Sequence, residues 1–116
     1  MRRRFRLRSS NDIERVRRSG KSYAHPLVVL IVLENAEDQT RIAVSAGRSV
    51  GNAVQRNRSK RLIREAVRPL IPQIKPGWDV LLLARQRLAG ATLWEIQPAL
   101  REVFRRAHLL IDRNGE

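Results

Sequence analysis

The chain has 116 residues, of which 24 are Lys or Arg and 11 are Asp or Glu, so its formal net charge is +13. This length suits one domain with a modest core, and a hydrophobic content of 42% excludes a chain that is disordered throughout. The sequence has no cysteine, which excludes disulfides and thiolate metal sites. Because a charge of this size attracts polyanions, we expect a nucleic-acid partner.

The chain begins with a basic arm and a short predicted helix. Residues 1–8 are rich in arginine, and they fit either a frayed, solvated terminus or an arm that contacts phosphates. Ser9, Ser10 and Asn11 are candidate N-caps for a short helix that runs to about Arg18 and is stopped by Ser19-Gly20. Ile13 and Val16 mark the apolar side of this helix.

Two strands are expected after this helix. Residues 27–33 form a continuous apolar run rich in β-branched residues, which predicts a buried strand. Residues 41–46 predict a second strand, antiparallel to the first across the polar connection 34–40, and residues 21–24 fit a brief extended segment. The run at 27–33 is far shorter than the roughly 20 residues that span a bilayer. We therefore expect a cytoplasmic protein without a membrane partner.

Residues 52–68 predict a helix with one basic and one apolar side. Asn52 is a plausible N-cap, and Pro69 disfavours helical geometry at Arg68, so the helix is expected to end or bend there. At 100° per residue, one stripe carries basic side chains at i, i+4 spacing: Arg56, Lys60, Arg64 and Arg68. The opposite arc carries side chains that a core would cover: Leu62, Ile63, Ala66 and Val67.

Like charges at i, i+4 destabilise an isolated helix by a few tenths of a kcal/mol per pair. Little in the sequence of this helix offsets that cost, since Glu65 can pair with Arg61 but other acidic partners are lacking. The cost is understandable if a polyanion normally lies against the basic side. RNA contact is therefore favoured over a merely solvated surface.

The remainder of the chain predicts one more strand and one more helix. Residues 79–84 are uniformly apolar after the first position, which indicates a strand covered on both faces. Thr92 and Glu95 have the spacing of a capping box, and they predict the start of a C-terminal helix. Pro98 conflicts with one straight helix from Leu93, so either the helix starts at Pro98 or a bend separates its first turn.

Several chemistry-bearing residues are expected to have structural roles. Trp78 and Trp94 are interpreted as packing residues rather than platforms for bases, and Arg105 and Arg106 as solvated. Acidic residues are scattered along the sequence, so no cluster indicates the pair of metal ions of a protein-only nuclease. The whole chain, 1–116, reads as a single α/β sandwich domain with a small sheet.

The basic helix also carries a family resemblance. The string from Gly51 to Ala66, with Arg56-Asn57-Arg58 at its centre, resembles the signature of the bacterial ribonuclease P protein subunit. Similarity extends over roughly residues 5–110. The resemblance implies a fold like the second domain of ribosomal protein S5, with element order αβββαβα and a left-handed parallel strand–helix–strand crossover.

The resemblance further implies the function. Members of this family join a catalytic RNA, and the particle removes the 5′ leader from precursor tRNA. The RNA supplies the active site and Mg²⁺ supports the chemistry, so the protein has no catalytic or metal-binding residues and is inactive alone. Its implied partners are the ribonuclease P RNA and the 5′ leader, without DNA.

The implied site has two parts. Residues expected to bind the catalytic RNA are the signature positions and the last residue of the basic stripe: Arg56, Asn57, Arg58, Lys60, Arg61, Arg64 and Arg68. Residues expected to line the leader cleft are Ile13, Arg17, Tyr23, Ile31, Ser45, Arg48 and Asn52. Family members often carry aromatics where Ile13, Arg17 and Ile31 stand, which leaves aliphatic contact and guanidinium stacking at these positions.

Two other nucleic-acid functions compete with this interpretation. A small basic ribosomal protein or a general RNA chaperone would also suit the fold and the basic helix, but it would show no preference for a leader. A DNA-binding helix-turn-helix protein would need a compact helix pair, whereas strands flank the basic helix at 52–68.

Overall fold

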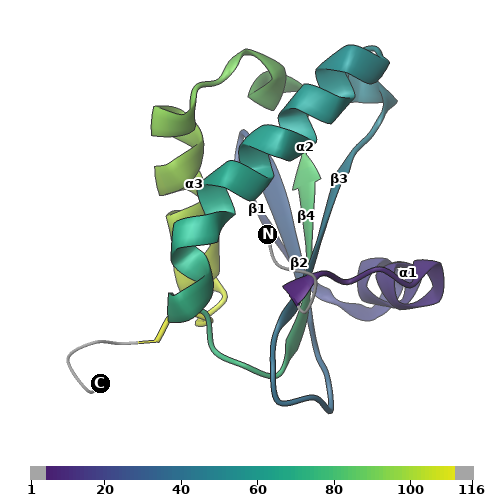
Figure 1. Cartoon of the computed structure of the whole chain (residues 1–116), viewed down its shortest axis with the longest axis vertical. Helices are drawn as coiled ribbons and strands as arrows, with labels where there is room; N and C mark the ends of the chain where they lie inside the picture. Colours follow the sequence, from purple (N-terminus) through teal and green to yellow (C-terminus); the bar gives the residue numbers. More distant parts are fainter. Residues whose placement is uncertain (1–4, 112–116) are drawn as a thin grey trace.

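The computed structural model describes residues 5–111. Within them, the helices are α1 (Ser10–Ser19), α2 (Ala53–Val67) and α3 (Leu93–Arg106), and the strands are β1 (Lys21–Ala24), β2 (Val28–Glu34), β3 (Arg41–Ala46) and β4 (Trp78–Ala84). Short 3-10 helices connect them: η2 (Arg48–Val50), η3 (Arg68–Gln73) and η4 (Gln86–Gly90). The predicted order of helices and strands, αβββαβα, is confirmed (Figure 1).

The sheet has the order β1-β2-β4-β3. β2 is antiparallel to both β1 and β4, whereas β3 and β4 are parallel and are joined through α2. The predicted pairing of residues 41–46 with residues 27–33 is therefore wrong, although their directions are opposite as expected. The uniformly apolar β4 lies between them, because the strand that is buried on both faces takes the central position.

Alternating side chains divide the core into two layers, one on each face of the sheet. α2 and α3 cover one face, where the core includes Val28, Leu30, Val80, Leu82, Ile63, Leu100 and Phe104. α1 covers the other face, where the core consists of Leu7, Val16, Ile31, Ala43 and Leu81. Figure 1 shows α1 apart from α2 and α3, across the sheet. This division determines which side chains can line a common surface.

The second half of the basic arm is part of the fold. The Leu7 N–H donates to the carbonyl of Ile42 at 2.8 Å, and Arg6 forms a parallel bridge with the same residue of β3. Leu7 is 4% exposed and belongs to the core beneath α1. A frayed terminus is therefore wrong for residues 5–7, whereas residues 1–4 lie outside the described part of the chain.

Local signals set the helix boundaries as predicted. The Ser9 hydroxyl caps α1 by accepting from the Asp12 N–H, and Asn52 and Gln55 form a capping box at the start of α2. Thr92 forms the predicted capping box of α3. α3 continues through Pro98, so neither predicted interruption occurs. Pro98 has no N–H to donate to the carbonyl of Trp94, four residues earlier. Because Trp94 is exposed, water can bond that carbonyl instead.

A buried carboxylate fastens α1 to the sheet. Asp79 at the start of β4 is fully buried, and it accepts from Arg41 Nε at 3.0 Å and Nη2 at 2.9 Å. Arg15 of α1 donates to it at 3.2 Å, and the Asn35 amide donates at 2.9 Å. The hydrogen bond to Asp79 raises the pKa of the Arg41 guanidinium, and the Asp12 carboxylate adds to this. This network joins α1, β3, β4 and the β2–β3 connection.

Replacing Asp79 with Ala should lower the free energy of unfolding by about 3 kcal/mol, because it removes the buried carboxylate that accepts from both Arg41 and Arg15. The half-buried Asp12 carboxylate, 3.1 Å from Arg15 and 3.9 Å from Arg41, would then face both cations alone. Urea unfolding followed by circular dichroism measures the change. Asp38→Ala is the matched control, since Asp38 is exposed. Equal stability of the two variants would contradict a structural role for the Asp79 network.

Candidate nucleic-acid interface

The core fixes the rotation of α2 about its axis. Ile63, Ala66 and Val67 are at most 1% exposed, and Ser59 extends the buried side one turn earlier. Ala66 faces α3, with which it lines a groove. Because these residues are buried, the basic side chains lie on the remaining sides of α2, and the packing of the helix determines which way each of them leaves it.

The predicted basic stripe lies on the side of α2 that faces the outer edge of β3. Arg64 lines a cavity with Ile13 of α1, with the β3 segment 42–44, and with Arg6 and Arg8 of the arm. Lys60 and Arg56 precede it at i, i+4 spacing, and all three are half-buried. The stripe therefore borders a cleft between α1 and α2.

Outward-facing residues of α2 are Asn57, Arg58 and Arg61, and all are exposed. Arg58 is also used inside the protein, because its Nη1 donates to the carbonyl of Ala89 in η4 at 3.1 Å. Arg68 pairs with Glu65 at 3.1 Å, so the expected partnership of Glu65 with Arg61 is wrong. Within residues 5–111, Arg56, Lys60 and Arg61 have no hydrogen bond or ion pair with another side chain.

The cavity beside Arg64 concentrates positive charge. Its volume is about 180 Å³, and its lining includes Arg6, Arg8 and Arg64 but no acidic residue. Partial burial lowers the pKa of Arg64, and the nearby charge of Arg6 lowers it further. A phosphate in this cavity would offset both the desolvation and the repulsion. The arrangement therefore suits an anion.

Of the predicted leader-cleft residues, Ile13 lines this cavity, and three more lie on α1 or on the sheet face that α1 covers. Ile13 and Arg17 come from α1, and Ser45 and Ile31 belong to the sheet face beneath it. Ile13 and Ser45 are half-buried and Arg17 is exposed, whereas Ile31 is only 5% exposed. Ile31 thus belongs to the core beneath α1 and does not line this cavity.

The other three predicted cleft residues have different surroundings. Arg48 and Asn52 are exposed where the chain leaves β3 and enters α2. The Asn52 oxygen accepts from the Gln55 N–H at 2.9 Å, which leaves its amide NH₂ for an outside partner. Tyr23 packs against the core on the α2–α3 face, and Lys21 lies 5.5 Å from its ring centroid. Its assignment to the cleft beneath α1 is therefore wrong.

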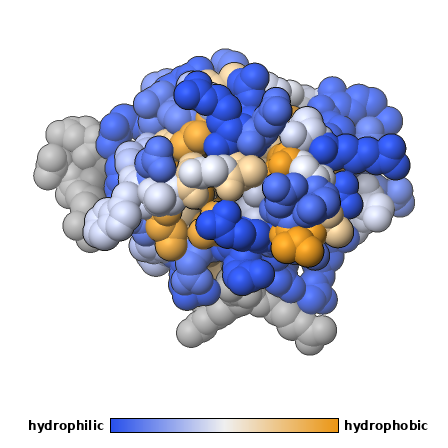
Figure 2. All heavy atoms as spheres, turned by 90° about the horizontal axis from the view of Figure 1, so that it is seen from above, coloured by the Kyte–Doolittle hydropathy of each residue, from blue (hydrophilic) through white to orange (hydrophobic). Residues whose placement is uncertain are grey.

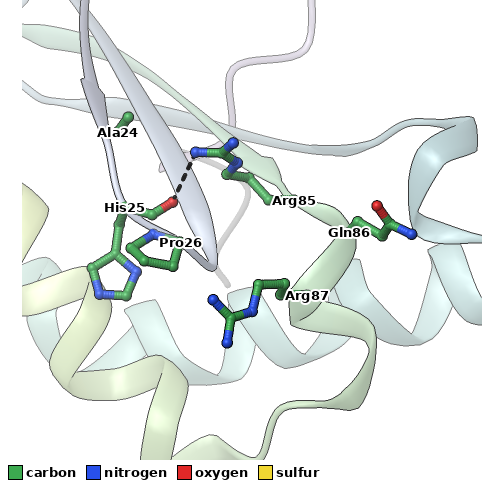
Figure 3. Close-up of a pocket in the computed structure, with 6 residues that line it drawn as sticks. All are labelled: Ala24, His25, Pro26, Arg85, Gln86 and Arg87. Atoms are coloured by element: carbon green, nitrogen blue, oxygen red, sulfur yellow. Dashed lines mark hydrogen bonds between the residues drawn. The ribbon is translucent and has the colours of Figure 1, made fainter.

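A second basic pocket was missed by the sequence interpretation. It lies between the β1–β2 turn and the segment after β4, and its lining residues are Ala24, His25, Pro26, Arg85, Gln86 and Arg87 (Figure 3). Both guanidinium groups extend toward the turn, and Arg85 donates to the His25 carbonyl at 3.4 Å. The signal in the sequence is the Arg85-Gln86-Arg87 triplet, which follows β4 directly.

This pocket lies at the same end of the sheet as Arg48. Ala84 at the end of β4 is opposite Ala46 at the end of β3, so the segments that follow these residues leave one edge together. Figure 2 views this end of the molecule and shows mainly hydrophilic residues, with apolar residues exposed in small separate groups. Basic groups thus extend from the arm past α2 to the end of β4.

Neither a metal-ligand group nor a membrane span is found in the described residues. Between residues 5 and 111, no three His, Asp or Glu side chains are grouped in a way that could hold a metal ion. No helix in the same range is long and apolar enough to cross a bilayer.

Comparison of the sequence with known proteins identifies one family. The profile of the family described as Ribonuclease P matches residues 1–108. The ribonuclease P protein component of Herpetosiphon aurantiacus is 42% identical over 113 residues, which cover 97% of this chain and 92% of that protein. The component of Clostridioides difficile is 36% identical over 106 residues, covering 90% of this chain and 93% of the relative.

Solved structures agree with this result. The RNase P protein of Staphylococcus aureus superimposes with a TM-score of 0.81 at 31% identity, covering 91% of this chain and 97% of that chain. The RNase P protein of Thermotoga maritima superimposes with a TM-score of 0.78 at 28% identity, covering 87% of this chain and 96% of that chain. The chain therefore belongs to the ribonuclease P protein family, whose members are subunits of the endoribonuclease that processes tRNA 5′ ends.

Proposed function

We propose that the basic side of α2 binds the ribonuclease P RNA, and that the cleft between α1 and α2 holds the 5′ leader of precursor tRNA while the RNA performs the cut. The observation that carries this proposal is the set Arg56, Lys60 and Arg61, which has no partner within residues 5–111 on a helix whose rotation the core fixes. Free, oriented cations of this kind suit phosphates. Asn57 adds a neutral donor and acceptor between them.

The leader would contact the cleft by apolar surface and charge. Ile13 and Ser45 offer half-buried atoms along the cleft, and exposed Arg17 can stack its guanidinium on an unpaired base. At the far end, Arg48 and the NH₂ of Asn52 lie beside the start of α2. The pocket of Arg85 and Arg87 would extend the path for the phosphates of a single strand.

The Mg²⁺ ions of the reaction are proposed to be held mainly by the RNA. Among the described residues no group of carboxylates offers a divalent ion a site, and the most buried carboxylate, Asp79, already accepts from two arginines. Mg²⁺ prefers several waters and phosphate oxygens. The role of the protein would be to neutralise RNA phosphates, which lowers the Mg²⁺ concentration that folding and substrate binding require. The protein alone would not cleave RNA.

Replacing Lys60 and Arg61 together with Ala should weaken binding of ribonuclease P RNA by roughly tenfold or more, because each substitution removes a charged hydrogen-bond donor to a phosphate. The negative slope of log K against log salt should become less steep by about 1.5, since each lost phosphate contact removes about 0.7–0.9 from its magnitude. Filter binding across a salt series measures both quantities. We prefer this pair to Arg58, whose bond to Ala89 also supports η4.

The matched control is Arg18→Ala with Lys75→Ala, which removes the same charge from two exposed positions outside the α2 surface. The control should bind nearly as well as the unsubstituted protein. An equal loss in both double variants would mean that net charge, and not the α2 surface, determines binding, and the proposed interface would be wrong.

Replacing Arg17 with Ala should reduce affinity for precursor tRNA by roughly five- to tenfold in the assembled enzyme, because a base loses its stacking partner, an interaction worth about 1–3 kcal/mol. Affinity for mature tRNA, which lacks the leader, should not change. Arg18→Ala on the same helix is the control. An equal loss for both RNAs would place Arg17 outside the leader path.

A further inference from the structure

Trp94 is exposed to an unusual degree for its size. Its side chain lies in the first turn of α3, and it is 84% exposed, more than any other large hydrophobic residue between residues 5 and 111. The expectation that Trp94 packs into the core is therefore wrong. A single exposed apolar residue needs no explanation by itself, so the case depends on what surrounds this indole.

The surroundings of Trp94 on α3 are cationic. A solvent-facing stripe, defined by the spacing i, i+4, i+7 and i+11, consists of Trp94, Pro98, Arg101 and Arg105. All four residues are exposed, and they lie opposite the buried Ile96, Leu100 and Val103. The stripe itself contains two guanidinium groups and no carboxylate.

The acidic residues of α3 lie to one side of this stripe and have partners of their own. Glu95 accepts from the Thr92 N–H at 2.9 Å in the capping box. Glu102 lies 3.9 Å from Arg106, which also donates to the Ala24 carbonyl at 2.7 Å. The charges of Arg101 and Arg105 are therefore not offset by the acids of their own helix.

A groove runs beside the stripe, between α3 and the end of α2. It has a volume of about 420 Å³ and its lining residues are Ala66, Pro69, Leu70, Gln97, Pro98 and Arg101. Its floor is mainly apolar, and Arg101 lies at its rim with one weak contact, 3.5 Å, to Gln73. An aromatic ring, an apolar groove and two guanidiniums that have no ion pair within residues 5–111 together match the base and the phosphates of a nucleotide.

We propose that this stripe is a second RNA contact, on which an unpaired base of the ribonuclease P RNA stacks on Trp94 while the adjacent phosphates bind Arg101 and Arg105. The inference rests on the proposed function of α2, because α2 and α3 lie side by side and one large RNA can reach both. The base must be unpaired, since a base inside a helix does not offer its face to a side chain. A second copy of the chain fits poorly, because its charge of +13 would repel these arginines.

Fluorescence provides the direct test, because the chain has two tryptophans and Trp78 is the partly buried one. In Trp78→Phe, Trp94 is the sole reporter. Adding ribonuclease P RNA should quench its emission and lower its acrylamide quenching constant at least threefold. If the RNA binds, as a gel shift shows, but the quenching constant stays that of the free protein, the inference is overturned.

Substitution of Trp94 tests the energetic contribution. Trp94→Leu should weaken RNA binding roughly fivefold or more, and Trp94→Phe should restore most of it, because a phenyl ring still stacks. Since Trp94 is exposed, both variants should fold, which circular dichroism checks. Equal binding by the Leu and Phe variants at the unsubstituted level would overturn the proposal.

Two further outcomes separate the alternatives. If the unsubstituted protein fails to bind the RNA at all, the proposed function of α2 is wrong, and the inference about Trp94 is overturned with it. If Trp94 becomes protected from acrylamide as the protein concentration rises without RNA, a second copy of the chain covers the stripe and the RNA assignment is overturned.

Discussion

Burial of one side of α2 is the constraint on which the nucleic-acid surface depends. Ile63, Ala66 and Val67 must lie against the sheet and α3 for the larger core to close, and this fixes where every basic side chain of the helix points. The same packing crowds like charges along Arg56, Lys60 and Arg64, which no acidic residue in the described chain relieves. A helix of this kind is stable because the core holds it and not because its surface favours it. In the proposed function, RNA phosphates would replace water and counterions along this helix and would release the repulsion that remains in the free protein.

The opposite face of the sheet meets a different requirement, the placement of α1. The apolar contact of α1 with the sheet is small, since Val16 is its only fully buried residue. Arg15 and Asp12 supplement this contact through the network around Asp79 and Arg41, which is itself anchored in β3 and β4. Because α1 is held in this way, and the described part of the arm pairs with β3 at Ile42, a cleft remains open between α1 and α2. Charge lines that cleft and apolar surface forms its floor, as a single-stranded polyanion requires.

Features that depend on neighbouring residues could be predicted from the sequence, and features that depend on distant pairing could not. The Asn52 capping box, the end of α2 before Pro69 and the basic stripe follow from local chemistry. The insertion of β4 between β2 and β3 depends on pairing across more than 30 residues. Asp79 likewise binds Arg41, which lies 38 positions away in the sequence, and Arg15, which lies 64 positions away. Tyr23 was misplaced because an alternating strand does not reveal which of its faces meets α1. Trp94 could have been recognised, since it falls outside the periodic set that runs from Ile96 through Leu100 to Val103.

The most direct test of the account is 5′ cleavage of a precursor tRNA at a Mg²⁺ concentration too low for a bacterial ribonuclease P RNA to act by itself. Three reactions are compared, containing the RNA, the protein, or both. The account predicts cleavage at the mature 5′ end only when both are present, because the protein supplies charge and leader contacts while the RNA supplies the active site. Cleavage by the protein alone, or an RNA whose Mg²⁺ requirement is the same with and without the protein, would contradict it.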